Sequence, residues 1–586
     1  MTDSIPARLI EQAKLRPNAP AYYVREGGVW KASDWRSYAD ETSRAGRALI
    51  ALGLEGGQTV CILGFNRPEW AIMDLACMGA GGAPAGIYTT CSPAEVQYIL
   101  AHSEAPIVLV EDEGQWKKVE QELENLPDLR HVVMMRGAAT IAHEKVLSWE
   151  EFLAKGDAVE ERAYLDRLEA LEPQGLATLI YTSGTTGPPK GVMLSHENLA
   201  WTASTAHGMF KTHDEDCSLS YLPLSHIAEQ MFTLHIPITV GSQVYFAESI
   251  EKVPDNLKEV QPTVFFGVPR IWEKFHAGIA GKLKLATGVK AKLVKWAMGV
   301  GKRVTEQKMR GQAGGGLSYA IANKLIFSKL KPAVGLGRAR VCVTGAAPIA
   351  REVLEFFGAL DIIVLEVYGQ SEGSGPTTFN RPERFLFGSV GPALPGVEVK
   401  IAEDGEICAK GPNVFLGYYK DEAATSETLI DGWLHSGDLG EIRDGFLHIT
   451  GRKKDIIITA GGKNVTPKNI ESAMKNHELI NEAVVIGDRR KFLSVLLTID
   501  PDAGPKWAAG NSVEFDRMHE DPNLHAEIQR HMELVNKDLA RVEQLKKFTI
   551  LSRNFTVEDG ELTPTLKVKR NKVNEHFADQ IEAMYA

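Results

Sequence analysis

The sequence lacks any apolar stretch long enough to cross a membrane, and it has few cysteines. No run approaches about 18 uncharged apolar residues; the run from Ile362 to Tyr368 is broken by Glu366, as suits a buried strand. No basic region followed by an apolar core is present near residue 1, so no secretory signal is evident. The six cysteines show no CxxC or Cys/His spacing. These absences argue against disulfides and structural zinc, and they predict a cytoplasmic protein.

The composition is that of an ordinary globular protein of more than one domain. The chain has 586 residues, of which 44% are hydrophobic and 24% charged. A chain of this length is too long for a single hydrophobic core, so we expect at least two domains.

Positive charge is concentrated in residues 281–340. This stretch holds 14 Lys or Arg and one acid, Glu306, whereas the whole chain has a net charge of −11. Apolar residues such as Leu285, Val289 and Trp296 alternate with the lysines. A cationic amphipathic segment of this kind predicts peripheral contact with an anionic membrane, at the inner face. A solvated helical insertion is the alternative, and nucleic acid is disfavoured because the rest of the chain is acidic.

Strand-like runs that often end at glycine alternate with helical stretches in the first two-thirds of the chain. This pattern predicts doubly wound α/β layers. After Gly388 the strands shorten and are separated by Gly and Pro, as in a small β-barrel or antiparallel subdomain. The charged GRKKD at 451–455 precedes a compact α+β segment, in which we expect a helix over about 523–546. We therefore expect a large domain at 1–451, a hinge at 452–455 and a small mobile domain at 456–586.

The most informative motif is YTSGTTGPPKGVMLSHEN, which starts at Tyr181. It follows an apolar run that reads as a buried strand. Glycine backbone N–H groups, hydroxyls and one ammonium, Lys190, are the donors that suit a polyphosphate. The motif is not a GxxxxGK[ST] loop, because Pro189 and Gly191 stand at two of the required positions. The predicted phosphate loop comprises Thr182, Ser183, Gly184, Thr185, Thr186, Gly187 and Lys190.

With further motifs in the same order, this segment resembles the adenylate-forming (AMP-binding) superfamily over essentially the whole chain. Within it, the chain is most similar to long-chain fatty acyl-CoA synthetases. The subfamily resemblance rests chiefly on DGWLHSGDLGEIRDGFLHITGRKKD, residues 431–455. It implies a ligase that adenylates a fatty acid with ATP and Mg2+, releases pyrophosphate, and then forms a thioester with CoA.

The resemblance assigns nucleotide-binding roles to three further segments. In VYGQSE, Tyr368 would stack on adenine and Glu372 would bind Mg2+, with Thr182 as a second metal ligand. Gly345, Ala346 and Ala347 resemble the loop on the other face of adenine. Asp438 would bind the ribose hydroxyls and Arg452 the ribose or phosphate. The predicted nucleotide site therefore contains Gly345, Ala346, Ala347, Tyr368, Gln370, Ser371, Glu372, Asp438 and Arg452.

The resemblance also implies that the small domain turns between two half-reactions. Lys454 would be the hinge, and Lys567 would reach the α-phosphate, with Lys569 as the runner-up. Gly461 and Gly462 would face the pantetheine channel after rotation. His226 falls where the family has a wall beside the acyl tunnel, but Gln230 stands where some members have a tryptophan gate.

Three alternatives remain open at this point. The chain could be an aryl- or medium-chain acid CoA ligase, or an acyl-AMP ligase that loads a carrier protein instead of CoA. It could also be a nucleotide-binding sensor without activity. Because the phosphate loop, Glu372, Asp438, Arg452 and a C-terminal lysine occur together, the sensor is the weakest of the three.

Overall fold

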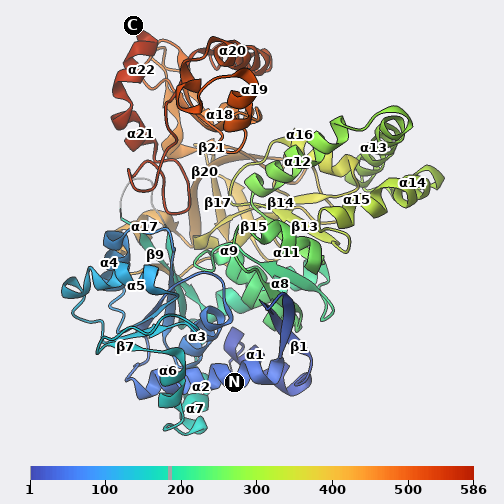
Figure 1. The fold of residues 1–586 in the computed structure, drawn as a ribbon. Coiled ribbons are helices and arrows are strands. Elements are labelled where there is room, and N and C mark those ends of the chain that lie inside the picture. The colour runs from blue at the N-terminus through green and yellow to red at the C-terminus, as the bar shows by residue number, and fades with distance from the viewer. Residues whose placement is uncertain (1, 183–187) are drawn as a thin grey trace.

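The computed structural model describes residues 2–182 and 188–586, and it has the predicted α/β architecture (Figure 1). Five residues of the predicted phosphate loop, Ser183, Gly184, Thr185, Thr186 and Gly187, lie outside the described residues. The large N-terminal part contains the two α/β layers, and the C-terminal part from α18 onward lies at the end of the molecule remote from the N-terminus.

The largest sheet has eight strands in the order β18-β9-β8-β4-β3-β5-β6-β7. The strands from β8 to β7 run parallel, whereas β9 is antiparallel to both β8 and β18. Their bounds are β3 Thr59–Leu63, β4 Ala83–Ile87, β5 Ile107–Val110, β6 His131–Met134, β7 Val146–Leu147, β8 Leu176–Thr182, β9 Lys190–Ser195 and β18 Gly417–Tyr418. Fully buried Val, Ile and Leu in β3 and β5 explain why these strands form the interior of a sheet covered on both faces.

Helices cover this sheet and fill the space beside it. Helix α3 is buried along its whole length and lies in the core, because all but two of its residues, Glu69 and Asp74, are uncharged and most are apolar. The helices of the first half are α1 Ile5–Leu15, α2 Trp35–Ala51, α3 Pro68–Gly79, α4 Pro93–His102, α5 Glu113–Glu120, α6 Trp149–Gly156, α7 Glu161–Glu169, α8 His196–Phe210, α9 Ile227–Gln230, α10 Ile236–Val240 and α11 Val253–Val260. A π-helical turn, Met231–His235, joins α9 to α10.

Two four-stranded sheets complete the α/β layers. In the order β12-β13-β14-β15 the first three strands are parallel and β15 is antiparallel. The other sheet has the order β10-β11-β1-β2. The bounds are β1 Pro20–Glu26, β2 Val29–Asp34, β10 Cys217–Ser220, β11 Gln243–Phe246, β12 Val264–Gly267, β13 Val341–Thr344, β14 Val364–Gln370 and β15 Gly375–Phe379.

The β-rich segment after Gly388 forms a five-stranded antiparallel sheet, in which β20 pairs with β17, β19 and β21. Its strands are β16 Glu398–Ile401, β17 Glu406–Lys410, β19 Leu429–Ile430, β20 Trp433–Arg443 and β21 Phe446–Arg452, and α17 Glu422–Thr428 precedes β19. The long pair β20–β21 ends beside Arg452, directly before the predicted hinge.

The C-terminal part is a compact α+β unit with its own buried core. A three-stranded sheet in the order β24-β25-β26 is packed against helices, and a short pair, β22 and β23, precedes it. The bounds are β22 Ile457–Ile458, β23 Asn464–Val465, α18 Pro467–Lys475, β24 Ile480–Ile486, β25 Leu493–Ile499, α19 Gly504–Asn511, α20 Pro522–Lys537, β26 Leu545–Ile550, α21 Arg570–His576 and α22 Ala578–Tyr585.

The helix expected over about 523–546 is shorter than predicted. Helix α20 ends at Lys537, and the chain then turns into β26, which pairs in parallel with β25. Leu545 and Ile550 are buried in that pairing. Residues 538–544 form turns, and strand pairing replaces the expected helix only from Leu545 onward.

The basic segment forms an arm of helices at the right-hand side of the molecule in Figure 1. The arm consists of α12 Pro269–Lys284, α13 Gly288–Met309, α14 Leu317–Ala322 and α15 Ser328–Ala333, and α16 Arg351–Ala359 packs against α13. Among residues 2–182 and 188–586, no helix is both long and apolar enough to span a bilayer.

Candidate active site

Most of the predicted site residues line one large cavity of about 2320 Å³. Its wall is built from the ends of β8, β9 and β14, the β20–β21 sheet and two segments of the C-terminal part. Ligands gather beyond the carboxyl ends of strands in sheets of this kind. Thr182, Lys190, Ala346, Ala347, Tyr368, Gln370, Ser371, Glu372, Asp438, Arg452, Lys454, His226 and Lys567 all face this cavity.

Thr182 and Lys190 hold the two ends of the predicted phosphate loop in register. They are paired across the β8–β9 hairpin, and the Thr182 hydroxyl donates to the Lys190 carbonyl at 3.4 Å. The Lys190 ammonium lies 4.9 Å from the ring centroid of Tyr418 and 3.5 Å from an Asp421 carboxylate oxygen. The hairpin therefore places a cation at the cavity wall, opposite Thr182 in the β8–β9 pairing.

Tyr418 connects Lys190 to Glu372. Its ring lies beneath the lysine, and its hydroxyl donates to Glu372 Oε1 at 2.7 Å. Burial and the neighbouring Glu372 raise the pKa of Tyr418, so the phenol stays protonated and remains a donor. Lys190 and Glu372, which the sequence predicted separately and which lie nearly two hundred positions apart, are thus joined through Tyr418 into one array of side chains.

Glu372 suits a magnesium ion held jointly with substrate phosphates. The carboxylate follows β14 in a 3-10 turn, is only partly buried, and faces the cavity. Mg2+ keeps several waters and is usually bound by one or two carboxylates plus phosphate oxygens. A single partly buried carboxylate fits that chemistry, and Thr182, the other predicted metal ligand, lines the same cavity.

Asp438, Tyr368 and Arg452 form a second array. The Tyr368 hydroxyl donates to Asp438 Oδ2 at 3.0 Å, and Arg452 Nε lies 3.1 Å from Asp438 Oδ1. The β20–β21 register sets Asp438 directly opposite Arg452. Burial, with Asp438 close by, raises the pKa of Tyr368 well above its usual value. Both carboxylate oxygens are thereby oriented at the cavity wall.

The loop after β13 approaches the cavity through its backbone. A Cβ on Gly345 would lie 2.5 Å from Val367 Cγ1, so only glycine fits at that position. Ala346 adopts φ 67°, in the left-handed region. Ala346 and Ala347 line the cavity, whereas Gly345 lies behind them.

Lys567 is brought into the cavity from the C-terminal part, and Lys569 is not. The surrounding protein lowers the pKa of Lys567, first by desolvation and then through the cations of Arg452 and Lys468, while Asp438 and Glu372 act in the opposite direction. Its side chain remains accessible to water within the cavity. Lys569 is the N-cap of α21 and lies outside the lining residues.

His226 also faces the cavity, as a neutral imidazole. Its Nδ1 accepts from the backbone N–H of Ala228 at 3.1 Å, which leaves Nε2 to carry the proton. Burial, with the charge of Lys567 nearby, lowers the pKa of His226 to about 4. His226 and Lys567 therefore approach each other across the cavity.

Part of the cavity wall is apolar, and we call it the apolar branch; it includes Ile227 and Ala228, which follow His226 in the chain. Gln230, at the position of the family's gate, is buried away from it and donates to the Leu224 carbonyl at 3.0 Å. The next two residues, Met231 and Phe232, line the branch, and Phe232 stacks on Phe266 with centroids 4.9 Å apart. Further apolar lining residues are Ala206, Phe210, Leu222, Ile227, Ile236 and Val268.

Besides Gly345, two predicted residues of the described chain lie outside the cavity lining. Gly461 and Gly462 occupy the exposed turn between β22 and β23, outside the cavity lining. Gly462 adopts φ +70°, and its N–H donates to the Thr459 carbonyl at 2.8 Å. Lys454, in the 3-10 turn Lys453–Asp455, does line the cavity.

The sequence reasoning missed two contributors to the site. The segment Gly417-Tyr418-Tyr419 matches no motif in the sequence. Only the pairing of β18 with β9 shows that Tyr418 lies beside Lys190. Lys468, in the first turn of α18, lies close enough to Asp438 and Arg452 for their charges to affect its pKa, which burial lowers. The sequence placed Lys468 in the first turn of a helix that starts at Thr466-Pro467, but it could not show that the Lys468 side chain lies close to Asp438 and Arg452.

Comparison with known proteins agrees with this geometry. Residues 9–419 match the family described as AMP-binding enzyme, and residues 454–586 match the AMP-binding enzyme C-terminal domain. The chain belongs to the AMP-binding enzyme family.

Curated relatives carry a more particular name. Long-chain-fatty-acid–CoA ligase ACSBG2 of Gallus gallus is 38% identical, over 96% of this chain and 79% of that protein. Long-chain-fatty-acid–CoA ligase FadD15 of Mycobacterium bovis is 36% identical, over 100% of this chain and 97% of that protein. Among solved structures, the A domain of carboxylic acid reductase from Segniliparus rugosus, bound to AMP and a carboxylic acid, has the same fold. It superposes with a TM-score of 0.75 at 19% identity, over 99% of this chain and 94% of that chain.

Proposed function

We propose that this protein is a long-chain fatty acid–CoA ligase, which uses ATP and CoA. The observation that carries the proposal is the single cavity in which Lys190, Glu372, Asp438 and Lys567 meet an apolar branch beside His226. The polar walls suit a nucleotide and the branch suits an acyl chain. The names of the full-length relatives support the long-chain substrate.

In the first half-reaction, a fatty carboxylate oxygen attacks the α-phosphorus of ATP. The bond from that phosphorus to the bridging oxygen breaks, and pyrophosphate leaves. Lys190 and Lys567 offset the repulsion between the anions, and Tyr418 holds Glu372 in place. Glu372, with Thr182, would hold Mg2+, which supplies charge neutralisation for the leaving pyrophosphate. No protein nucleophile is needed, so positioning and electrostatics supply the catalysis.

The binding arrangement follows from the second array. Tyr368 offers an aromatic face for adenine, with Ala346 and Ala347 as the opposite wall, and Asp438 accepts from the ribose hydroxyls. Arg452 is held by Asp438 through Nε, which leaves its other guanidinium donors for the sugar or phosphate. Gln370 and Ser371 supply polar groups at the same edge.

In the second half-reaction, the CoA thiolate attacks the acyl carbonyl and AMP leaves. Gly461 and Gly462 lie on an exposed turn, so they reach the cavity only if the C-terminal part turns about Lys454. That turn withdraws Lys567, which is needed only in the first step. The division into residues 1–451, 452–455 and 456–586 follows from this proposal.

ATP–pyrophosphate exchange with and without palmitate tests the proposal, with the product of added CoA identified by mass. We expect palmitate-dependent exchange and palmitoyl-CoA. Exchange only with aryl or medium-chain acids would contradict the long-chain assignment. Exchange that yields no CoA thioester, but acylates a carrier protein, would contradict the CoA assignment, and ATP binding without exchange would indicate a sensor.

We also propose that the helical arm binds an anionic membrane surface. Leu285, Val289 and Trp296 are 81%, 83% and 40% exposed, although they are large apolar residues. In the part of the chain that the structure describes, Lys290, Lys292 and Lys295 form no ion pair and are exposed around them. Further along α13, Ala297, Val300 and Val304 are buried in a cluster with Ala322 and Phe327, which anchors the helix to the rest of the arm. Cations that surround exposed apolar residues match anionic lipid headgroups.

Sedimentation with vesicles tests the arm. We expect binding to phosphatidylglycerol vesicles and little to phosphatidylcholine vesicles. The triple variant Lys290→Glu, Lys292→Glu, Lys295→Glu should bind at least about tenfold more weakly, since each basic residue near the surface contributes about 1 kcal/mol. The matched control reverses Lys155, Lys537 and Lys546 on other surfaces. Equal binding of both triple variants would overturn the proposal.

A further inference from the structure

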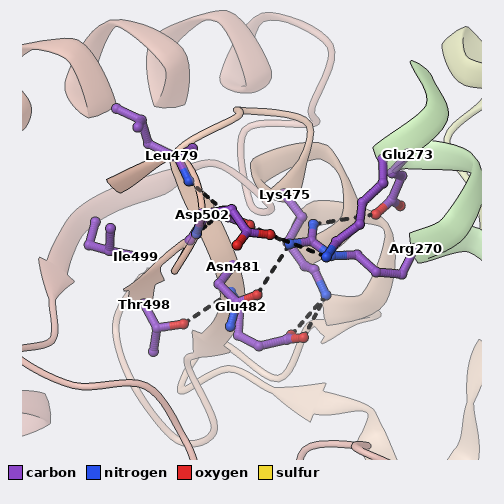
Figure 2. A network of polar contacts seen from close by, with 12 residues as sticks. Arg270, Glu273, Lys475, Leu479, Asn481, Glu482, Thr498, Ile499 and Asp502 are labelled. Carbon is purple, nitrogen blue, oxygen red and sulfur yellow. Dashed lines mark hydrogen bonds and ion pairs between the residues drawn. The ribbon is translucent and has the colours of Figure 1, made fainter. Parts of the chain in front are cut away.

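A charged contact joins helix α12 to the C-terminal part, outside the arrays described above. Arg270, in the first turn of α12, forms an ion pair with Asp500 at the end of β25. One turn along the helix, Lys274 Nζ lies 3.2 Å from Asp502 Oδ2. Figure 2 shows Arg270 and Glu273 reaching from α12 toward Asn481, Glu482 and Asp502 of the C-terminal part.

The Arg270–Asp500 pair is the more buried of the two. Asp500 is 6% exposed, and its Oδ1 accepts from the backbone N–H groups of Asp502 and Ala503, both at 2.9 Å. Desolvation opposes ionisation of this carboxyl, but the backbone donors and Arg270 prevail and hold its pKa below the usual value. Removing Arg270 would therefore leave a buried anion without its cation, whereas Lys274 and Asp502 are mostly exposed.

Polar contacts continue from Asp500 toward Lys567. The Asn481 side-chain oxygen accepts from the Arg270 guanidinium at 3.5 Å. The Asn481 side-chain amide donates to Asn554 Oδ1 at 2.9 Å, and the Asn554 amide donates to the Ile499 carbonyl at 3.0 Å. Arg553, which precedes Asn554 in the chain, forms an ion pair with the fully buried Glu561.

From Glu561 the chain leads directly to the cavity. The Glu561 carbonyl accepts from the Lys569 N–H at 2.7 Å. The Lys567 N–H donates to the Thr563 hydroxyl at 3.0 Å. The loop that carries Lys567 is thus fixed to the same rigid unit as Asp500, so the orientation of that unit decides where the lysine lies.

We propose that Arg270 and Asp500 are positioning residues for adenylation: their ion pair holds the C-terminal part in the orientation that brings Lys567 to the nucleotide. This inference rests on the proposed function. Neither side chain is required to touch the reacting atoms. The pair favours the first half-reaction and contributes nothing to attack by the CoA thiol on an adenylate already formed.

A double-mutant cycle tests the pair with Arg270→Gln, Asp500→Asn and the two combined. Asparagine at 500 keeps an oxygen for the Asp502 and Ala503 N–H groups, so the local turn is preserved. We expect each single variant to lower kcat of ATP–pyrophosphate exchange by about tenfold or more, and the double variant to be no worse, because the pair acts as one unit. KM for ATP should stay within about twofold, as should thioester formation from supplied acyl-adenylate. The control Lys274→Gln should stay within about threefold of the wild type, as exposed pairs contribute little.

A readout that does not need activity is tryptic cleavage after Lys453 or Lys454. Loss of the pair should accelerate this cleavage in Arg270→Gln and Asp500→Asn, but not in Lys274→Gln. Unchanged exchange and unchanged cleavage would overturn the inference, as would equal loss of both half-reactions in a folded variant. A wild-type protein without exchange would instead refute the proposed function, while the cleavage pattern would still decide whether the pair holds the C-terminal part.

Discussion

Lys567 shows how far single residues can be predicted from the sequence. Spacing and neighbours favoured Lys567 over Lys569 but did not decide between them. In the structure Lys567 lies close enough to Glu372, Asp438 and His226 for their charges to interact, whereas Lys569 is the N-cap of α21. Sequence reveals that a lysine is present, but which lysine faces a cavity depends on the packing of the loop that carries it.

Replacing Lys567 should separate the half-reactions. We expect Lys567→Ala to reduce ATP–pyrophosphate exchange by at least about a hundredfold, because one charge that offsets developing charge is lost. Thioester formation from supplied acyl-adenylate should persist. Lys569→Ala is the matched control and should retain both steps; the reverse result would assign the role to Lys569.

Glu366 predicts a pH dependence of stability. Burial raises its pKa from 4.5 to about 8, and its Oε2 accepts from the Gly388 N–H at 2.9 Å. The folded protein therefore binds a proton that the unfolded chain releases, so this contribution is fully present below pH 4.5 and is lost as the pH rises through about 8.

The variant Glu366→Gln keeps the acceptor but cannot ionise. Between pH 6 and 9 it should gain about 2 kcal/mol of unfolding free energy relative to the wild type. Thermal unfolding midpoints of both proteins across this range measure the effect. A constant difference in midpoint would contradict the neutral, buried state of Glu366.

At the scale of elements, the hairpin β8–β9 and its neighbour β18 build the part of the cavity wall to which we assign the phosphates. The strands of the α/β layers were predictable, because runs rich in Val, Ile and Phe that often end at glycine are typical of buried parallel strands. The structure has a strand at each of these runs, with bounds that agree within a few residues. The antiparallel addition of β18 was not, since it pairs segments more than two hundred residues apart. For the same reason Tyr418 was missed, and the expected helix over about 523–546 ran into the first residues of β26.

Tyr418→Phe tests this element directly. The variant keeps the ring beneath Lys190 but loses the hydroxyl that orients Glu372. We expect the Mg2+ concentration for half-maximal exchange to rise by about tenfold or more, as for loss of a group that supports a metal ligand. Metal-free nucleotide affinity should be unchanged. An unaltered Mg2+ requirement would show that Glu372 does not hold the metal.

At the scale of the whole molecule, the predicted α/β fold with a small C-terminal part is confirmed, but its orientation could not be read from the sequence. Orientation depends on contacts between distant surfaces, such as Arg270 with Asp500, which no motif marks. The turn at 453–455 is itself anchored, because Lys453 Nζ lies 2.6 Å from Asp404 and 2.9 Å from Glu406.

Restricting this turn should affect only the second step. Proline fixes φ near −65°, so Lys454→Pro should keep ATP–pyrophosphate exchange within about threefold and lower thioester formation by about a hundredfold. Single-turnover assays of each step measure the two effects. If both steps fell equally in a folded variant, rotation about Lys454 would not be the change that links them.

The central claim is that a fatty carboxylate is activated by bonding directly to the α-phosphorus of ATP. Palmitate labelled with oxygen-18 in its carboxyl group tests this in one reaction with ATP, Mg2+ and CoA. The account predicts one labelled oxygen in the AMP released and none in pyrophosphate, because the bridging oxygen leaves with AMP when the thioester forms. Unlabelled AMP, or label in inorganic phosphate beside ADP, would contradict it.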